Sequence, residues 1–307
     1  MKDGVSGKAG DTMVTSAGPA QRLPATPVVL PTRLYDAYIF DLDGTIYLGQ
    51  DLLPGAKRLI DQLRARGRAV RFLSNNPTRD REMYVRKLAG LGIPVELDDV
   101  VNTVVTMTRW LKANHPEAVV FPIAEQPLIR SLEHAGIRMS EDPAEIDIVI
   151  ASYDRGFDYR KLQIAFDAIW FHRRARLVAT NPDPYCPMGG GRGEPDAAAV
   201  IAAIQACTGA KLEVNTGKPD PIMVHAALDG LGVDPSACAM VGDRMSTDIG
   251  MALNARMVSV LVLTGETTLH DLGGLAPSDS PDFILDRIDR LVPEDIWREL
   301  GWTEDDR

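Results

Sequence analysis

The chain has 307 residues, of which 45% are hydrophobic, which is enough apolar material for one large domain or two ordinary ones, and two is our working number. The formal net charge of -10 disfavours sequence-independent binding to the phosphates of nucleic acids, so no nucleic acid partner is expected. The cysteines form no CxxC pair, and no apolar run approaches the roughly 18 to 20 residues that span a bilayer, so we expect a cytoplasmic protein without a membrane partner.

Residues 1–33 are rich in Gly, Ala, Ser, Thr and Pro, and we expect a disordered tail there, because so little apolar surface cannot offset the entropy of ordering. From Leu34 onward, short β-branched runs alternate with helical stretches. Strands are predicted at "AYIF", "AVRFL", "DVVNTVV", "ACAMVG" and "VSVLVL", and helices at "GAKRLIDQLRARG", "DREMYVRKLAGLG" and "PIMVHAALDGLG". This alternation predicts an α/β fold with a doubly wound parallel sheet, covered by helices on both faces.

A second block with the same pattern lies at about residues 104–213. Its predicted strands are "AVVFPI", "IDIVIAS" and "ARLVATN", and its helical segments include "YRKLQIAFDAIWFHR" and "EPDAAAVIAAIQACTG". These runs are enough for a second α/β domain.

Two aspartates, Asp41 and Asp43, end the apolar run "YIF" with one leucine between them. Side chains two positions apart in a strand point the same way, so we expect the carboxylates to be neighbours. Two unit charges about 4 Å apart repel by about 4 kcal/mol at an effective dielectric constant near 20, so a cation or a shared proton must relieve them. Oxygen ligands of this kind suit Mg²⁺. Taken alone, the same letters also fit a strand end followed by a turn, with Gly44 left-handed and Thr45 as a cap.

Polar residues suited to phosphate chemistry follow three other predicted strands. They are Ser74, Asn75 and Asn76 after "VRFL", Lys218 in "NTGKPDP", and Asp243 and Asp248 in "CAMVGDRMSTD". In open α/β sheets, ligands bind at the carboxyl ends of the strands, so these residues are predicted to converge on one site. Separately, each also fits a helix cap, a turn or a surface charge. A Walker P-loop is excluded, because Pro219 follows Lys218 where that motif has Ser or Thr.

Taken together, these motifs resemble those of the haloacid dehalogenase superfamily of phosphohydrolases, which have the forms DxDGT, a strand-terminal Ser or Thr, a Lys, and GDxxxxD. The segments "SNNP", "ATNPD", "GKPDP", "MVGDRMSTDI" and "LVLTG" resemble its para-nitrophenylphosphatase-like, or NagD-like, branch. The resemblance covers about residues 34–290. It implies a Rossmann-like core with a large inserted α/β cap domain.

The spacing of the motifs indicates where the insert lies. The stretch from Asp41 to Ser74 has room for one helix and one crossover, whereas the stretch from Ser74 to Lys218 is far longer than one strand–helix–strand step requires. We therefore predict four segments: a disordered tail at 1–33, a hydrolase core at 34–103 and 214–290, an inserted cap at 104–213, and a C-terminal helix or tail at 291–307.

The resemblance implies a role for each core residue. Asp41 would be the nucleophile that forms an aspartyl-phosphate, Asp43 the general acid and base, and Lys218 the cation that offsets the negative charge. The Mg²⁺ cofactor would be held by Asp41, the backbone carbonyl of Asp43, and Asp243, with Asp248 ordering its water ligands. The phosphate-binding residues would be Gly44, Thr45, Ser74, Asn75, Asn76 and Lys218.

The predicted cap would decide which substrate enters the site. Candidate specificity residues lie in its polar loops "YDRGFDY" and "ATNPDPYCPMGGGRGEPD". They are Asp154, Arg155, Asn181, Asp183, Tyr185 and Arg192. Polar residues in loops are commonly just solvated, so each of these also fits a purely structural role.

The resulting hypothesis is a Mg²⁺-dependent phosphatase for small phosphate monoesters, such as a sugar or polyol phosphate, phosphoglycolate or a nucleoside monophosphate. A phosphomutase that uses the same aspartyl-phosphate is an alternative, and a phospho-accepting signalling module is a more distant one. Dehalogenation is disfavoured, because it would leave Asp43 and the pair Asp243 and Asp248 without a purpose. Members of the family often associate through cap surfaces, so a homo-oligomer is left open.

Overall fold

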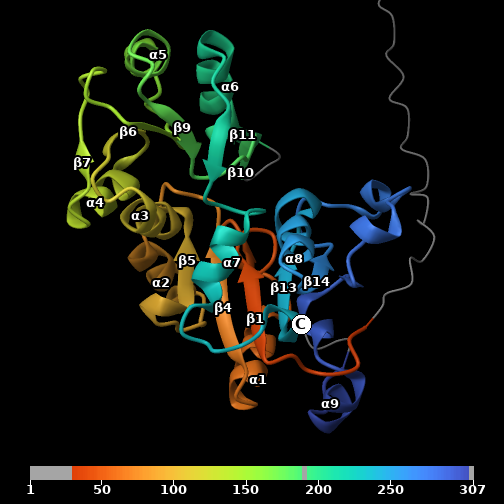
Figure 1. Ribbon diagram of the computed structural model, residues 1–307. Coiled ribbons are helices and arrows are strands. Elements are labelled where there is room, and N and C mark those ends of the chain that lie inside the picture. Colours follow the sequence, from red (N-terminus) through yellow and green to blue (C-terminus); the bar gives the residue numbers. More distant parts are fainter. Residues whose placement is uncertain (1–29, 189–191, 304–307) are drawn as a thin grey trace, which may run out of the picture.

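The computed structural model describes residues 30–188 and 192–303. Most of the predicted N-terminal tail and the last four residues of the predicted C-terminal segment therefore lie outside the described part of the chain. Figure 1 shows two groups of strands and helices, with the core sheet in the lower half and a second sheet above it. No helix in the described ranges is both long enough and apolar enough to cross a membrane.

The core sheet has six parallel strands in the order β15, β14, β13, β1, β4, β5. Their bounds are β1 Ala37–Asp41, β4 Ala69–Ser74, β5 Val100–Asn102, β13 Cys238–Gly242, β14 Val258–Val262 and β15 Phe283–Leu285. β1 lies at the centre, paired with β13 on one side and β4 on the other. All five of its residues are buried, as expected for a parallel strand that is covered on both faces.

Helices cover both faces of the core sheet. They are α1 Ala56–Ala65, α2 Arg81–Gly90, α7 Pro221–Leu228 and α8 Gly250–Asn254. Tyr38 and Phe40 of β1 pack in one apolar cluster with α1 and α2, and Ala37 and Ile39 pack in another with α7 and α8. This alternation follows from the two-residue period of a strand. A short helix, α9 Glu294–Glu299, follows the last core strand.

The second sheet is also parallel and has the order β12, β9, β8, β6, β7. Its strands are β6 Val119–Ile123, β7 Arg138–Met139, β8 Ile148–Ala151, β9 Arg176–Ala179 and β12 Leu212–Asn215. Its helices are α3 Thr103–Asn114, α4 Gln126–His134, α5 Tyr159–Phe166 and α6 Ala197–Thr208. α3 and α4 pack on one face, and α5 and α6 on the other. We call residues 103–215 the inserted unit, because they lie between core strands β5 and β13. The predicted fold class is confirmed.

Two antiparallel hairpins complete the structure. The first, β2 Tyr47–Leu48 with β3 Asp51–Leu52, directly follows β1. The second, β10 Tyr185–Met188 with β11 Arg192–Pro195, belongs to the inserted unit and lies above the core sheet in the view of Figure 1.

Two local predictions were wrong. The run "DVVNTVV" is a strand only over Val100–Asn102, because the Asn102 side chain accepts a hydrogen bond from the Val105 N–H and caps α3 there. Strand β1 ends at Asp41, so Asp41 and Asp43 do not share one side of a strand. After Asp41 the chain turns, and the N–H groups of Ile46 and Tyr47 both donate to the Leu42 carbonyl.

Candidate active site

The strand order brings the predicted motifs to one edge of the core sheet. Asp41 is the last residue of β1, Ser74 is the last residue of β4, and Asp243 follows the end of β13. These three strands are adjacent and parallel, so their carboxyl ends lie side by side. This edge is where open α/β sheets bind ligands.

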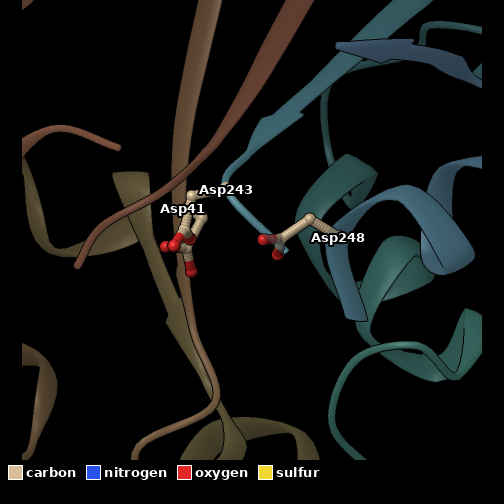
Figure 2. A group of neighbouring side chains, drawn as sticks. All are labelled: Asp41, Asp243 and Asp248. Carbon is tan, nitrogen blue, oxygen red and sulfur yellow. The ribbon is translucent and has the colours of Figure 1, made fainter. Parts of the chain in front are cut away.

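Three buried aspartates form the centre of the site. Asp41, Asp243 and Asp248 each offer a carboxylate oxygen, and these oxygens lie within 4.8 Å of one another. Figure 2 shows Asp41 and Asp243 close together, with the Asp248 carboxylate directed toward them from the other side. Asp248 is fully buried in the helical turn Met245–Ile249, where its Oδ2 accepts a hydrogen bond from the Arg244 N–H at 3.0 Å.

Lys218 brings a positive charge into this group. Its Nζ contacts Asp41 Oδ1 and donates to Asp248 Oδ1 at 2.6 Å, and only 3% of its side chain is exposed. The loop that carries Lys218 is held by Asn75, whose Oδ1 accepts from the Lys218 N–H at 2.8 Å and whose Nδ2 donates to the Lys218 carbonyl at 3.1 Å. Two segments that are far apart in the sequence are thereby fixed to each other.

Burial and charge act together on these groups. Burial raises the pKa of Asp41 well above its usual value; the Lys218 ammonium opposes that shift, and the charges of Asp248 and Asp243 add to it. Burial and the Asp248 charge raise the pKa of Asp243 to about 6. Burial lowers the pKa of Lys218, but Asp248 and Asp41 outweigh it and leave that pKa above its usual value. One ammonium faces three crowded carboxylates, so the site favours an additional cation.

The donor set fits a divalent metal ion. Asp243 Oδ2 accepts a hydrogen bond from the Glu266 N–H at 2.6 Å, while Asp243 Oδ1 is buried with no hydrogen-bond partner among the described residues. A buried carboxylate oxygen without a partner is costly, and a cation would satisfy it. A site built only from carboxylate oxygens suits a hard ion such as Mg²⁺.

Glycines leave the space that the carboxylates occupy. A Cβ at Gly265 would lie 2.0 Å from Asp243 Oδ2, and one at Gly242 would lie 2.2 Å from the Asp248 carboxyl carbon. A Cβ at Gly44, which has a φ of 87°, would lie 2.6 Å from Asp243 Oδ2. Any larger residue at these three positions would collide with the carboxylate of Asp243 or Asp248, so glycine is required there.

We expect the Gly265→Ala substitution to lower kcat/KM by about tenfold to a hundredfold, because displacing a catalytic group by about 1 Å can cost a factor of this size. The Asp243 side chain would have to move away from the added methyl group. The matched control is Gly90→Ala in α2, where a Cβ meets nothing within 4 Å. Steady-state kinetics of both variants test this prediction; equal activity of the two would show that the position of Asp243 does not matter.

Asp43 lies beside the acidic group. Its side chain is exposed, and its carboxylate is not one of the three clustered carboxylates. It nevertheless lines the same cavity as Asp41, and it accepts a hydrogen bond from Tyr47 Oη at 3.3 Å. The two aspartates therefore line one cavity, Asp41 from the end of β1 and Asp43 from the turn that follows it.

The residues predicted to bind phosphate differ in what their polar groups contact. Ser74 Oγ lies 2.8 Å from Tyr84 Oη and accepts a hydrogen bond from the Asn76 N–H, while the side chain of Asn75 holds the Lys218 loop. The N–H of Gly44 donates to the Tyr47 carbonyl. Thr45 is fully buried, and its Oγ1 has no hydrogen-bond partner within the described ranges. The N–H of Gly44 and the Asn75 amide thus serve the structure of the loops.

A cavity of about 60 Å³ lies between the edge of the core sheet and the inserted unit. Predicted residues that line it are Asp41, Asp43, Ser74, Asn75, Asn76, Asp183, Tyr185 and Lys218. The inserted unit reaches the core here, because Asn75 Nδ2 donates to Asp183 Oδ2 at 2.9 Å and Asn76 Nδ2 lies 3.6 Å from Cys186 Sγ. The cavity is small, and most of the side chains that line it are polar.

The other predicted specificity residues lie elsewhere. Asp154 and Arg155 line a different cavity, where Asp154 pairs with Lys161 and Arg155 forms a two-point ion pair with Glu125. Asn181 is fully buried and donates to Asp183 and Asp196. Arg192 is exposed on β11 and is not among the residues that line the first cavity. The structure therefore brings Asp183 and Tyr185 to the cavity. The other predicted specificity residues do not line it: Asp154, Arg155, Asn181 and Arg192.

Sequence reasoning missed several residues that line this cavity, namely Cys186, Pro187, Asp196, Arg244 and Thr247. Arg244 pairs with Glu266 at 3.0 Å and lies 3.7 Å from Asp183. Its place directly after Asp243, within a motif that was recognised, was an available signal. Asp196 caps α6, and burial raises its pKa to about 6. No local pattern distinguishes it from an ordinary helix cap.

The chain is similar to known hydrolases over most of its length. A model of haloacid dehalogenase-like hydrolases matches residues 38–138, and a HAD-hydrolase-like model matches residues 215–291. The chain is 34% identical over 250 residues to Sugar-phosphatase AraL of Bacillus subtilis, covering 81% of this chain and 89% of that protein. It is 34% identical over 240 residues to Acid sugar phosphatase of Staphylococcus aureus, covering 78% of this chain and 91% of that protein.

A solved structure is similar along most of its length. The 4-nitrophenylphosphatase of Thermotoga maritima superimposes with a TM-score of 0.78 at 33% sequence identity, covering 84% of this chain and 96% of that one. The similarity thus covers most of both chains.

Proposed function

The chain belongs to the haloacid dehalogenase superfamily, in its para-nitrophenylphosphatase-like or NagD-like branch, and on this premise we propose that it is a Mg²⁺-dependent phosphatase acting on small phosphate monoesters through an aspartyl-phosphate. The observation that carries the proposal is the buried group of Asp41, Asp243 and Asp248 around Lys218, at the edge of the sheet where ligands bind.

In the proposed reaction, Asp41 attacks phosphorus and a carboxylate–phosphorus bond forms while the ester oxygen–phosphorus bond breaks. Asp43 gives a proton to the leaving oxygen. Asp43 then takes a proton from a water molecule, which attacks phosphorus, releases inorganic phosphate and restores Asp41. Lys218, which contacts Asp41 Oδ1, offsets negative charge on the nucleophile and on the phosphoryl group.

Asp41 and Asp243 would hold the metal ion, with the Asp43 carbonyl as a further ligand and Asp248 ordering its water ligands. When bound, Mg²⁺ supplies charge neutralisation for the phosphoryl oxygens. Ser74 Oγ faces the same cavity and would donate a hydrogen bond to one of those oxygens. Burial of the clustered aspartates keeps water from screening these interactions.

The substrate class we propose is a small, soluble phosphate monoester, with sugar phosphates first. Two relatives that are 34% identical over most of this chain are named as sugar phosphatases. The small cavity supports a compact substrate. A panel of several dozen phosphate esters, assayed for release of inorganic phosphate with and without Mg²⁺, tests the proposal. Rearrangement of a sugar phosphate into its isomer, without phosphate release, would instead indicate a phosphomutase.

We expect Asp43→Asn to lower kcat/KM for phenyl phosphate by about 10² to 10⁴-fold, through loss of proton transfer to the leaving oxygen. The phenolate released from this ester is a poor leaving group. p-Nitrophenyl phosphate needs less protonation of its leaving group, so its kcat/KM should fall much less. Both esters are aryl phosphates of similar shape, and kcat/KM covers the steps up to the first irreversible one. An equal loss for the two esters would show that Asp43 is not the acid.

A further inference from the structure

Tyr47 contacts Asp43 through both its backbone and its side chain. It begins β2, and its backbone forms a bridge with Asp43 while its carbonyl accepts a hydrogen bond from the Gly44 N–H at 2.8 Å. Its hydroxyl donates to Asp43 Oδ2 at 3.3 Å. Among the described residues, this is the one hydrogen bond to the Asp43 carboxylate. The turn after β1 thus places the Tyr47 hydroxyl next to the carboxylate of Asp43, the residue that we propose as the acid.

The ring of Tyr47 is buried, whereas the Asp43 side chain is exposed. Tyr47 is fully buried in the apolar cluster formed by the core sheet with α1 and α2. The Lys87 Nζ lies 3.3 Å from the centre of its ring, so a cation from α2 packs on the aromatic face. Asp43 is exposed on a turn, and a short side chain there has several rotamers available. The hydroxyl is therefore presented from a buried ring to an exposed carboxylate.

We propose that Tyr47 is a positioning residue for proton transfer: its hydroxyl fixes Asp43 Oδ2, so that the other carboxylate oxygen carries the transferable proton toward the leaving group. The Tyr47 hydroxyl exchanges no proton with the substrate. The same hydrogen bond holds Asp43 while it removes a proton from water in the second step. This inference depends on the proposed function, because it assigns Tyr47 a part in the reaction of that site.

The test compares Tyr47→Phe with wild type on phenyl phosphate and p-nitrophenyl phosphate. Removal of the hydroxyl keeps the ring and its contact with Lys87. We expect kcat/KM to fall about tenfold for phenyl phosphate and less than about twofold for p-nitrophenyl phosphate. The lost hydrogen bond is to a carboxyl group that becomes charged as it gives up its proton, and p-nitrophenyl phosphate depends less on that proton. Equal losses, or no loss, for the two esters would overturn the inference.

A double-mutant cycle separates positioning from a general effect on folding. In the Asp43→Asn background, Tyr47→Phe should cost nothing further on phenyl phosphate, because the two residues act as one unit. Additive losses would contradict the proposal. The control is Tyr38→Phe, which removes another buried hydroxyl of the same apolar cluster, one that accepts a hydrogen bond from the Tyr35 N–H. That variant should keep the wild-type ratio between the two esters.

The same data distinguish failure of the inference from failure of the proposed function. If Asp43→Asn is selective for phenyl phosphate and Tyr47→Phe is not, only the role of Tyr47 is wrong. If Asp43→Asn itself shows no selectivity, the acid role of Asp43 is wrong and the role of Tyr47 is refuted with it.

Discussion

The Asp41→Asn variant is expected to lose turnover by more than about 10⁴-fold, to the limit of detection, while it keeps its fold. An amide has the shape of the carboxylate but cannot attack phosphorus. The amide oxygen can still accept the hydrogen bond from Lys218, which retains Asp248 at 2.6 Å as its ionic partner. Removing one of three crowded carboxylates also reduces their mutual repulsion, so the stability of the variant should not fall.

The measurement is the rate of phosphate release from p-nitrophenyl phosphate, with the thermal unfolding midpoint as the check on folding. The matched control is Asp36→Asn. Asp36 precedes the other end of β1, and its carboxylate pairs with Arg68 at 2.9 Å. That exposed ion pair contributes little to stability, and the control should keep wild-type activity. Normal turnover by Asp41→Asn would remove Asp41 as the nucleophile.

Removal of divalent ions is expected to abolish turnover to the background of the assay, and Mg²⁺ is expected to restore it. Without the ion, the three clustered carboxylates are only partly offset by Lys218, which contacts Asp41 and Asp248, and by the more distant charge of Arg244. The attacking carboxylate must then approach a phosphate dianion in a site with excess negative charge. The experiment is dialysis of the full chain against a chelator, followed by titration with Mg²⁺. KCl at equal ionic strength is the control and should restore nothing.

The Asp243→Asn variant tests whether the requirement for a divalent ion depends on Asp243 as a metal ligand. It weakens the site at the carboxylate oxygen that is buried and has no hydrogen-bond partner among the described residues, so the Mg²⁺ concentration for half-maximal activity should rise by about tenfold to a hundredfold. Undiminished hydrolysis after chelation would refute the metal requirement. An unchanged Mg²⁺ dependence in Asp243→Asn would refute its assignment as a ligand.

The sequence predicted the fold class and the place where its motifs meet. A buried parallel strand leaves an unambiguous apolar run, and the carboxyl ends of neighbouring parallel strands must lie at one edge of the sheet. Asp41, Ser74 and Asp243 could therefore be placed together without any contact information. Lys218 joined them by its position in a recognised motif, and the structure shows that the Asn75 side chain fixes its loop.

The relation between Asp41 and Asp43 could not be predicted from strand geometry. The prediction assumed that β1 continues through Asp43, whereas β1 ends at Asp41 and the chain turns around the Leu42 carbonyl. This turn is what allows Tyr47 to reach Asp43. A pattern of apolar residues does not reveal where a buried strand stops when the following turn is buried as well.

The inserted unit was harder to interpret, because its contribution depends on how two sheets face each other. Asp183 and Tyr185 reach the cavity, whereas Asp154 and Arg155 lie in a loop that faces a different one. Both segments are polar and follow strands of the same sheet, so sequence alone does not separate them. Contacts such as that between Arg244 and Asp183 depend on the packing of the inserted unit against the core.

Trapping of the covalent intermediate tests the account most directly. The wild-type chain is mixed with Mg²⁺ and a phosphate ester, quenched with acid within one turnover, digested, and analysed by mass spectrometry. We predict one phosphoryl group on the peptide that contains Asp41, on the Asp41 side chain, and none when the divalent ion has been removed. A phosphoryl group on another residue, or steady turnover with no phosphorylated peptide at any quench time, would contradict the account.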